Sequence, residues 1–249
     1  MIKLVVDEKS WLMFKRRLWS RLWEDLEIGY LDKDLLPVLI LFNLDRDVYT
    51  LSSCSGRIVV SDSVYPWSRD EGSIVLKTHV PVKPDELALL LKKPVVRRLW
   101  LNATGPIVHL SARNIRTATY LLKVARMSGY KHSGILSLNK YKGVIIELTT
   151  GVRFSTFIGD ATNILETRDI DLLVEKANEI LLYGKLMLNR LYEVASKYLP
   201  RSVDEEVLND VRQREGLLKK KPIEIFAETA REKGLGDFVD RIEKMTDLR

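Results

Sequence analysis

The sequence predicts an α+β fold that is not Rossmann-like. Segments with helical periodicity are followed by strand-like segments whose short connections suit antiparallel pairing. The alternation of helices and strands is too irregular for a doubly wound sheet, and neither GxGxxG nor GxxxxGK[ST] occurs. A long helix ends at Pro200, beyond which the chain is rich in charge. We therefore expect one domain over residues 1–200 and a charged helical extension over residues 201–249.

The first sixty residues predict an extended segment, two helices and two strands. Residues 2–6 suit a short strand or an extended arm. Ser10 is expected to N-cap a helix that ends at Gly29, because Trp11 and the apolar residues after it follow helical spacing. Asp32 or Asp34 would cap the next helix, over residues 35–43, and strands are expected over residues 47–51 and 57–60.

Strand-like segments dominate the middle of the chain, and helices dominate its end. The expected strands cover residues 73–80, 95–101, 106–110, 142–150 and 152–157. The expected helices cover residues 84–91, 112–127, 169–199 and 223–233. In the second of these helices, an apolar stripe is formed by Ile115, Ala118, Leu122 and Ala125.

A helix, a Ser-Gly turn and strands occur twice, over residues 35–60 and 112–150. Because each helix is followed by a polar turn between strand-like runs, this order predicts an internal duplication of a helix–turn–hairpin unit.

The segment 51–57, here called the serine loop, has an unusual composition. It reads Leu51-Ser52-Ser53-Cys54-Ser55-Gly56-Arg57, and strand-like runs lie on both sides. Hydroxyl groups donate and accept hydrogen bonds, glycine permits close backbone approach, and arginine offers a planar set of donors. The loop can therefore hold a polar or anionic ligand. The alternative is a β-turn whose serines bond to nearby backbone groups.

Cys54 is the chain's one cysteine, and it has two interpretations. A thiol can act as a nucleophile when a histidine activates it, and the chain has three histidines. A free cysteine also serves as a small buried hydrophobic residue. Only Ser55 and Gly56 separate Cys54 from Arg57 in the sequence, which is too few residues for a phosphatase-type anion loop, so that class of enzyme is excluded.

Composition limits the function classes further. A hydrophobic fraction of 46% and a charged fraction of 30% over 249 residues describe a folded globular protein. Neither a membrane-spanning run nor a signal peptide is expected, and a single cysteine fits the cytoplasm. The histidines are far apart and there is no CxxC, so we expect no metal site. Because no apolar run is long enough to span a membrane, we also expect no membrane partner.

The net charge of +6 favours a polyanionic partner. Two segments interleave cations with aromatic rings, the combination that binds single-stranded RNA. The alternative is that the tryptophans belong to the core and the cations to a solvated face. The first segment contains Trp11, Phe14, Lys15, Arg16, Arg17, Trp19, Arg21 and Trp23, and the second contains Lys92, Lys93, Arg97, Arg98 and Trp100.

Asn178 and Asn189 lie on the predicted long helix, eleven residues apart. Since eleven residues make three turns, the two amides share a face. They could line a site, or they could be solvated or capping amides.

Several of these motifs together resemble the archaeal-type wybutosine-synthesis methyltransferases, the third enzymes of that pathway, which act on phenylalanine tRNA. The resemblance covers roughly residues 10–195 and excludes the tail after Pro200. The residues that carry it are Gly29-Tyr30-Leu31-Asp32, Asn43, Thr50, the serine loop with Ile58, His79, Pro106-Ile107-Val108-His109, Gly129 through Ile135, Asn178 and Asn189.

The resemblance implies an S-adenosylmethionine-dependent tRNA methyltransferase with its own architecture. The methyl group would go to the N4 ring nitrogen of the 7-aminocarboxypropyl-demethylwyosine base at position 37, and the partner would be the anticodon stem-loop of phenylalanine tRNA.

We expect Asp32 to be the base that removes the proton from the ring nitrogen, with His79 as the second candidate. Asp32 could instead serve only as an N-cap, and His79 could be purely structural. The residues expected to bind the cofactor are Ser53, Ser55, Arg57, His109, Ser133 and Gly134, and those expected to bind the substrate are Ser52, Cys54, Arg16, Arg17 and Trp67.

Two other functions stay open at this point. One is a non-catalytic RNA-binding module, and the other is a transferase that depends on Cys54.

Overall fold

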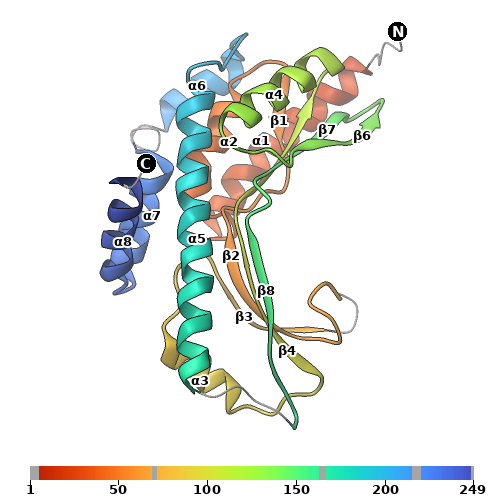
Figure 1. Cartoon of the computed structure of the whole chain (residues 1–249). Coiled ribbons are helices and arrows are strands. Elements are labelled where there is room, and N and C mark those ends of the chain that lie inside the picture. Colours follow the sequence, from red (N-terminus) through yellow and green to blue (C-terminus); the bar gives the residue numbers. More distant parts are fainter. Residues whose placement is uncertain (1–5, 69–71, 163–166, 215–219, 248–249) are drawn as a thin grey trace. The chain divides into compact units, whose positions relative to one another are not determined.

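A computed structural model of the chain describes residues 6–68, 72–162, 167–214 and 220–247. It confirms a mixed α+β architecture with two four-stranded antiparallel sheets, unlike a Rossmann fold (Figure 1). The chain forms two compact units that are each discontinuous in sequence. Unit 1 comprises residues 1–55, 106–151 and 187–226, and unit 2 comprises residues 56–105, 152–186 and 227–249.

The described elements have the following bounds. The helices are α1 Glu8–Glu27, the short 3₁₀ helix η1 Lys33–Leu35, α2 Leu36–Asn43, α3 Pro84–Leu91, α4 Ile115–Met127, α5 Thr167–Ala195, α6 Glu205–Gln213, α7 Pro222–Glu232 and α8 Gly236–Asp247. The strands are β1 Val48–Thr50, β2 Arg57–Asp62, β3 Ser73–Thr78, β4 Arg98–Thr104, β5 Ile107–Ala112, β6 Gly134–Asn139, β7 Gly143–Thr149 and β8 Arg153–Asp160.

Unit 1 is built around a sheet with the strand order β1-β5-β7-β6. All eight residues of α2 are buried, which fits a helix that is apolar on every side. Helix α1 buries one face, and the ring of Trp11 lies 5.2 Å from that of Tyr49 on β1. Along the first four residues of β5 and along β7 from Val144 onward, buried residues alternate with half-buried ones, so these stretches have a core face and a more open face.

Unit 2 has a sheet with the strand order β3-β2-β4-β8. Strand β2 buries every second residue, as expected for a sheet covered on one face. Side chains of α3 and of the first half of α5 pack on that face. This core contains Ile58, Val60, Val82, Leu87, Leu91, Leu99, Leu101, Ala103, Ile158, Ile170, Val174, Ala177 and Leu181.

The predicted elements are largely present, but their ends and faces differ in places. The prediction that Ser10 caps the first helix is wrong: Asp7 is the N-cap, and its carboxylate accepts a hydrogen bond from the backbone amide of Ser10 at 2.9 Å. In α4 the buried stripe is Thr117, Ala118, Leu121, Val124 and Ala125, whereas Ile115 is exposed. Residues 2–5 of the predicted N-terminal strand lie outside the described residues.

The serine loop is not the turn of a hairpin. Strand β1 before it pairs with β5, and strand β2 after it pairs with β3 and β4 in the other sheet. By contrast, β6 and β7 in the second predicted repeat pair with each other. The two segments therefore differ in strand pairing, and the internal duplication is not confirmed.

Residues 201–214 pack in unit 1 through several contacts. Arg46 donates its backbone amide to Ser202, and the indole nitrogen of Trp19 donates to Asp210 at 2.8 Å. The ammonium of Lys15, which is 2% exposed, lies 2.8 Å from the carboxylate of Asp204. The sequence predicts the helix over 223–233, but it does not predict α6 or α8. The assignment of 201–249 as an extension stays a prediction.

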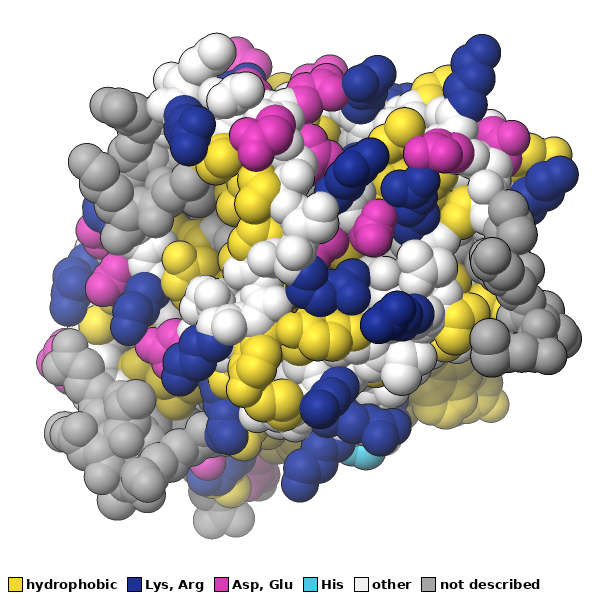
Figure 2. Space-filling model, turned by 90° about the horizontal axis from the view of Figure 1, so that it is seen from above, with side chains coloured by type: hydrophobic (Ala, Val, Ile, Leu, Met, Phe, Trp, Pro, Cys, Tyr) yellow, Lys and Arg dark blue, Asp and Glu magenta, His cyan; other side chains and the backbone are white. Residues whose placement is uncertain are grey.

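No helix within the described ranges is both long enough and apolar enough to cross a membrane. Lysine and arginine side chains are scattered among hydrophobic ones on the face shown in Figure 2, in keeping with the positive net charge.

Candidate active site

Asp32 lies at the start of η1 and is connected to the serine loop. Its backbone occupies the N-cap position, but its side chain makes no capping hydrogen bond. Instead, its Oδ2 accepts a hydrogen bond from the backbone amide of Ser55 at 2.9 Å. The N-cap alternative for this side chain is therefore wrong, because the carboxylate is directed at the serine loop.

Ser52 and Ser53 fix the first half of the serine loop against β5. Ser53 Oγ donates to the carbonyl of Leu51 at 3.0 Å and accepts from the backbone amide of His109 at 3.1 Å. The carbonyl oxygen of Ser52 lies 2.7 Å from Nδ1 of His109. Cys54 pairs with Ile107 through both of its backbone groups, so residues 51–54 lie beside the start of β5.

His109 lies between two hydrogen-bond acceptors. Its Nε2 is 3.0 Å from Oε2 of Glu147 on β7, and its Nδ1 faces the carbonyl of Ser52. Only a doubly protonated imidazole can donate to both acceptors at once. The site therefore includes Glu147, which our reading of the sequence missed. The available signal was a carboxylate within the otherwise apolar strand run 144–148.

The second polar turn, residues 130–134, is also part of this arrangement. Glu147 is the cross-strand partner of both His109 on β5 and Gly134 on β6. Ser133 Oγ donates to the carbonyl of Tyr130 at 2.8 Å and accepts from the amide of Thr149 at 3.1 Å. Unit 1 thus brings the serine loop up to Ser55 and the turn of residues 130–134 to one sheet, whereas Gly56 belongs to unit 2.

Tyr130 anchors the second turn from the core. Its side chain is fully buried, and its hydroxyl has no hydrogen-bond partner among the described residues. Burial raises the pKa of Tyr130 well above its usual value. The phenol therefore stays protonated near neutral pH, which excludes it as a general base.

A groove of about 750 Å³ lies between α1 and the serine loop within unit 1. Its volume is in the range of small-molecule sites. Arg17 and Arg21 line one side, and Ser52 and Ser53 line another. The guanidinium of Arg17 lies 4.9 Å from the centre of the Phe14 ring. The groove therefore combines cations and hydroxyl groups with two acidic residues, Glu24 and Asp25, and the carboxylate of Asp25 lies 3.6 Å from Arg21.

Unit 2 holds the remaining loop residues and the second base candidate. Gly56 has a φ of +100°, and a Cβ there would lie 2.9 Å from the carbonyl oxygen of Thr104, so only glycine fits. The half-buried guanidinium of Arg57 makes no hydrogen bond or ion pair with any described residue. His79 Nδ1 lies 2.9 Å from the carbonyl of Gly56, which leaves Nε2 as the basic nitrogen of the neutral ring.

The aromatic residues of the first basic segment belong mainly to the core. Trp11, Trp19 and Trp23 are at most 9% exposed, as the core alternative predicts. Lys15 is also buried, so the cations do not all form a solvated face. Arg16 is exposed and forms an ion pair with Glu206 at 2.9 Å. Trp67 of unit 2 is 74% exposed.

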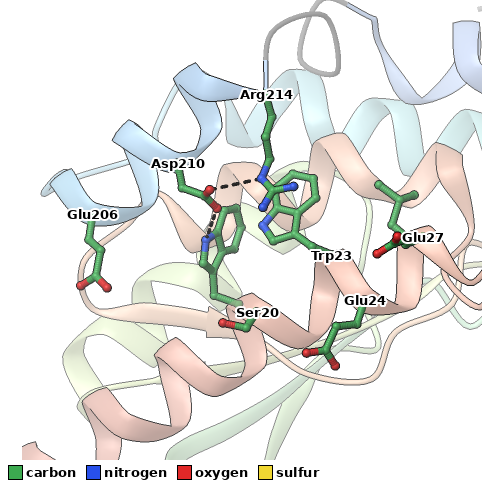
Figure 3. Close-up of a pocket in the computed structure, with 9 residues that line it drawn as sticks. Ser20, Trp23, Glu24, Glu27, Glu206, Asp210 and Arg214 are labelled. Carbon is green, nitrogen blue, oxygen red and sulfur yellow. Dashed lines mark hydrogen bonds and ion pairs between the residues drawn. The ribbon is translucent and has the colours of Figure 1, made fainter.

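A second pocket, of about 700 Å³, lies between α1 and α6 and contains none of the predicted site residues (Figure 3). Among the described residues that line it, four are acidic and Arg214 is the one cation. Asp210 already binds both Arg214 and the indole of Trp19. An acidic wall repels phosphate, so this pocket is unsuited to RNA.

The two asparagines of α5 hold the backbone rather than line a site. The buried amide of Asn178 accepts from the backbone amide of Val82 at 2.9 Å and donates to the carbonyl of the same residue at 2.8 Å. Asn189 accepts from the amide of Ile223 in the first turn of α7 at 3.4 Å. The capping interpretation therefore fits Asn189, and Asn178 anchors the segment before α3.

Comparison with known proteins places the chain in one family. The model of the family described as Methyltransferase TYW3 matches residues 13–197. A relative from Saccharolobus solfataricus is 41% identical over 196 residues, which is 78% of this chain and 93% of the relative. A relative from Aeropyrum pernix is 34% identical over 169 residues, or 68% of this chain and 89% of the relative. Both are named tRNA(Phe) 7-((3-amino-3-carboxypropyl)-4-demethylwyosine(37)-N(4))-methyltransferase.

Solved structures agree with this assignment. The PH1069 protein from Pyrococcus horikoshii has a TM-score of 0.70 and 28% identity, and the match covers 75% of this chain and 96% of that protein. A hypothetical protein from Aeropyrum pernix has a TM-score of 0.60 and 32% identity, covering 66% of this chain and 98% of that protein. The resemblance seen in the sequence is confirmed: the chain belongs to the family of the Methyltransferase TYW3.

Proposed function

We propose that this chain transfers a methyl group from S-adenosylmethionine to N4 of the 7-aminocarboxypropyl-demethylwyosine base at position 37 of phenylalanine tRNA. The observation that carries this proposal is the relative that is 41% identical along 93% of its own length and is named for that reaction. The enzyme class follows from the family, since its members are methyltransferases. A non-catalytic RNA-binding module is therefore not supported. Because tRNA is the substrate, we also propose the cytoplasm as the place of the reaction.

The residues present fit a donor and a substrate that both carry amino-acid groups. S-adenosylmethionine supplies a methyl group on a positively charged sulfur, which needs no further activation. Its methionyl carboxylate, or that of the aminocarboxypropyl group, would pair with Arg57, whose guanidinium has no partner within the described part of the chain. Ser53, Ser55, Ser133 and Gly134 would provide further polar groups for the ligand. His109 would contribute an imidazole ring that Glu147 orients.

The protein's main task is to hold the ring nitrogen in line with the methyl group. Such positioning can lower the barrier by up to about 7–11 kcal/mol. The nitrogen must also lose its proton, for which Asp32 is the proposed base and His79 the second candidate. The position of Asp32 supports this role, because the amide of Ser55 holds its carboxylate at the serine loop. The ring of His79 is oriented by its Nδ1, which lies 2.9 Å from the carbonyl of Gly56.

The tRNA would be held by its anticodon stem-loop. Arg17 lines the groove beside Ser52, and Arg16 is exposed on the next position of α1. In our proposal Ser52 and Cys54 contact the modified base, and Arg16 and Arg17 contact phosphates. Such contacts make binding strongly dependent on salt.

The decisive experiment incubates the protein with labelled S-adenosylmethionine and with phenylalanine tRNA that lacks only this methyl group. Nucleoside mass analysis should find one added methyl group on the tricyclic base. The same tRNA with an unmodified guanosine at position 37 is the matched control and should gain no label. Label that enters the control equally, or never enters the modified tRNA although the tRNA binds, would overturn the proposed reaction.

A further inference from the structure

The aromatic residues of α1 and those of residues 63–68 in unit 2 differ in whether their rings can reach a ligand. In α1 the indoles of Trp11, Trp19 and Trp23 are at most 9% exposed. In unit 2, Trp67 is 74% exposed and Tyr65 is 47% exposed. Residues 63–68, here called the aromatic loop, therefore present more aromatic surface to a partner than α1 does.

Tyr65 and Trp67 form a parallel stack. Their ring centroids are 5.1 Å apart, and their planes differ by 1°. Each ring therefore covers one face of the other and leaves an outer face, and the high exposure of Trp67 indicates that much of its surface is open. Exposing a large aromatic surface to water is unfavourable in free energy, and such a surface commonly marks a binding site.

The start of this loop is held firmly against the segment that leads into β4. The carboxylate of Asp62 accepts hydrogen bonds from the backbone amides of Val96 and Arg97, both at 2.8 Å. The amide of Ser63 donates to the carbonyl of Arg98 at 2.9 Å, and its hydroxyl donates to the carbonyl of Tyr65 at 2.8 Å. The base of the aromatic loop is thus anchored beside residues 96–98.

That neighbouring segment is cationic. The side chains of Lys92, Lys93, Arg97 and Arg98 are exposed, and none forms an ion pair with another residue in the described ranges. Their charge is therefore available to an external anion. A stack of open rings beside unpaired cations matches the two needs of unpaired RNA, namely a surface for a base and charge for its phosphates. An acidic protein partner would need the cations but not the ring stack.

We propose that Tyr65, Trp67, Arg97 and Arg98, together called the unit 2 RNA patch, bind an unpaired stretch of the tRNA substrate. The outer face of Trp67 stacks on a base, and the two arginines contact the adjoining phosphates. This inference rests on the proposed function, because it takes the RNA to be the tRNA that is methylated.

The test measures the affinity of the full chain for fluorescently labelled phenylalanine tRNA by anisotropy at several salt concentrations. Trp67→Ala should weaken binding about 5- to 100-fold, the range for loss of one stacked base. Trp67→Phe keeps a flat ring and should restore most of the affinity. Replacing both Arg97 and Arg98 with glutamine should lower the slope of log affinity against log salt by about one to two.

The matched control is Tyr141→Ala, which removes another exposed ring beside a cation, Lys140, in unit 1. This variant should leave the affinity within about twofold of the native value, a change much smaller than the effect of losing one stacked base. Unchanged tRNA binding by Trp67→Ala, or an equal loss of affinity in Tyr141→Ala, would overturn the patch.

Methyl-transfer assays on the native chain separate the two proposals. If the native protein transfers methyl groups and Trp67→Ala binds tRNA normally, only the patch is disproved. A native protein that binds through the patch without methyl transfer disproves the reaction alone.

Discussion

The carboxylate of Asp32 accepts a hydrogen bond from the backbone amide of Ser55 at 2.9 Å. This contact joins the residue before η1 to the centre of the serine loop, twenty-three positions later in the chain. The same carboxylate is the proposed base, so its role in holding the loop and its role in proton transfer must be separated by experiment.

Asp32→Asn separates the two roles of this carboxylate. The amide oxygen can still accept from Ser55, but the side chain is no longer basic. We expect turnover to fall about 10²- to 10⁴-fold, the contribution of general base catalysis, while the affinity for S-adenosylmethionine is retained. Single-turnover kinetics and calorimetric titration measure the two quantities.

Asp32→Ala, which removes the acceptor as well, is the comparison variant. If Asp32→Asn keeps native turnover and Asp32→Ala loses it, the carboxylate positions the serine loop and His79 becomes the base candidate.

Cys54→Ser tests whether the thiol takes part in the reaction. Cys54 pairs with Ile107 through backbone groups, and the substitution leaves these in place. Direct methyl transfer needs no thiolate, so turnover should stay within about threefold of the native rate, less than 1 kcal/mol in barrier height. A loss of more than about a hundredfold with an unchanged melting temperature would instead support a cysteine-dependent transferase.

Glu147→Gln tests the pair formed by Glu147 and His109. A hydrogen bond to a carboxylate is stronger than one to a neutral amide, so the ring of His109 is held less well in the variant. We expect kcat/KM to fall about tenfold, equivalent to about 1.4 kcal/mol. Glu179→Gln, which alters an exposed carboxylate that pairs with Lys176, is the control and should match the native enzyme. Equal rates for both variants would place Glu147 outside the site.

Gly56→Ala should destabilise the protein. The φ of +100° disfavours any side chain, and the new Cβ would lie 2.9 Å from a backbone oxygen of Thr104. We expect a loss of about 3 kcal/mol in the free energy of unfolding, measured by chemical denaturation. Gly236→Ala is the control, since its Cβ meets no atom within 4 Å. A Gly56→Ala protein with native stability would mean that the backbone of residues 104–105 shifts at little cost.

Lys15→Met tests the buried ion pair that joins α1 to residue 204. The change leaves the carboxylate of Asp204, 17% exposed, without its ammonium partner. Breaking such a pair costs about 3–5 kcal/mol of unfolding free energy. Arg16→Gln alters the neighbouring ion pair, whose side chains are 68% and 64% exposed, and should cost less than about 1 kcal/mol. Similar losses in both variants would contradict the burial argument.

The same lysine predicts a pH dependence. Burial lowers the pKa of Lys15 below its ordinary value of 10.5, and the hydrogen bond to Asp204 offsets part of this effect. Between the folded and the ordinary pKa, the unfolded chain binds more protons at this site. The stability of the native protein relative to Lys15→Met should therefore rise as the pH rises through this window, and it should decrease as the pH falls through the folded pKa. Urea denaturation of both proteins along a pH series measures the difference.

Local sequence determined the fold class, most of the elements and the family. Helical periodicity marked α1, α4 and α5, and Pro84 marked the start of α3, because these signals act within a few residues. The serine loop and the Gly129–Ile135 segment carried the family resemblance. The same local signals failed at the N-cap of α1, where Asp7 competes with Ser10 for the position.

Tertiary structure alone decided which distant residues meet. The row His109, Glu147 and Gly134 exists because β5, β7 and β6 pair in one register, and strand register depends on packing between segments rather than on any local motif. Packing also placed the tryptophans of α1 in the core and left Trp67 exposed. Burial is a property of the assembled layers, so spacing along the chain could not distinguish the two.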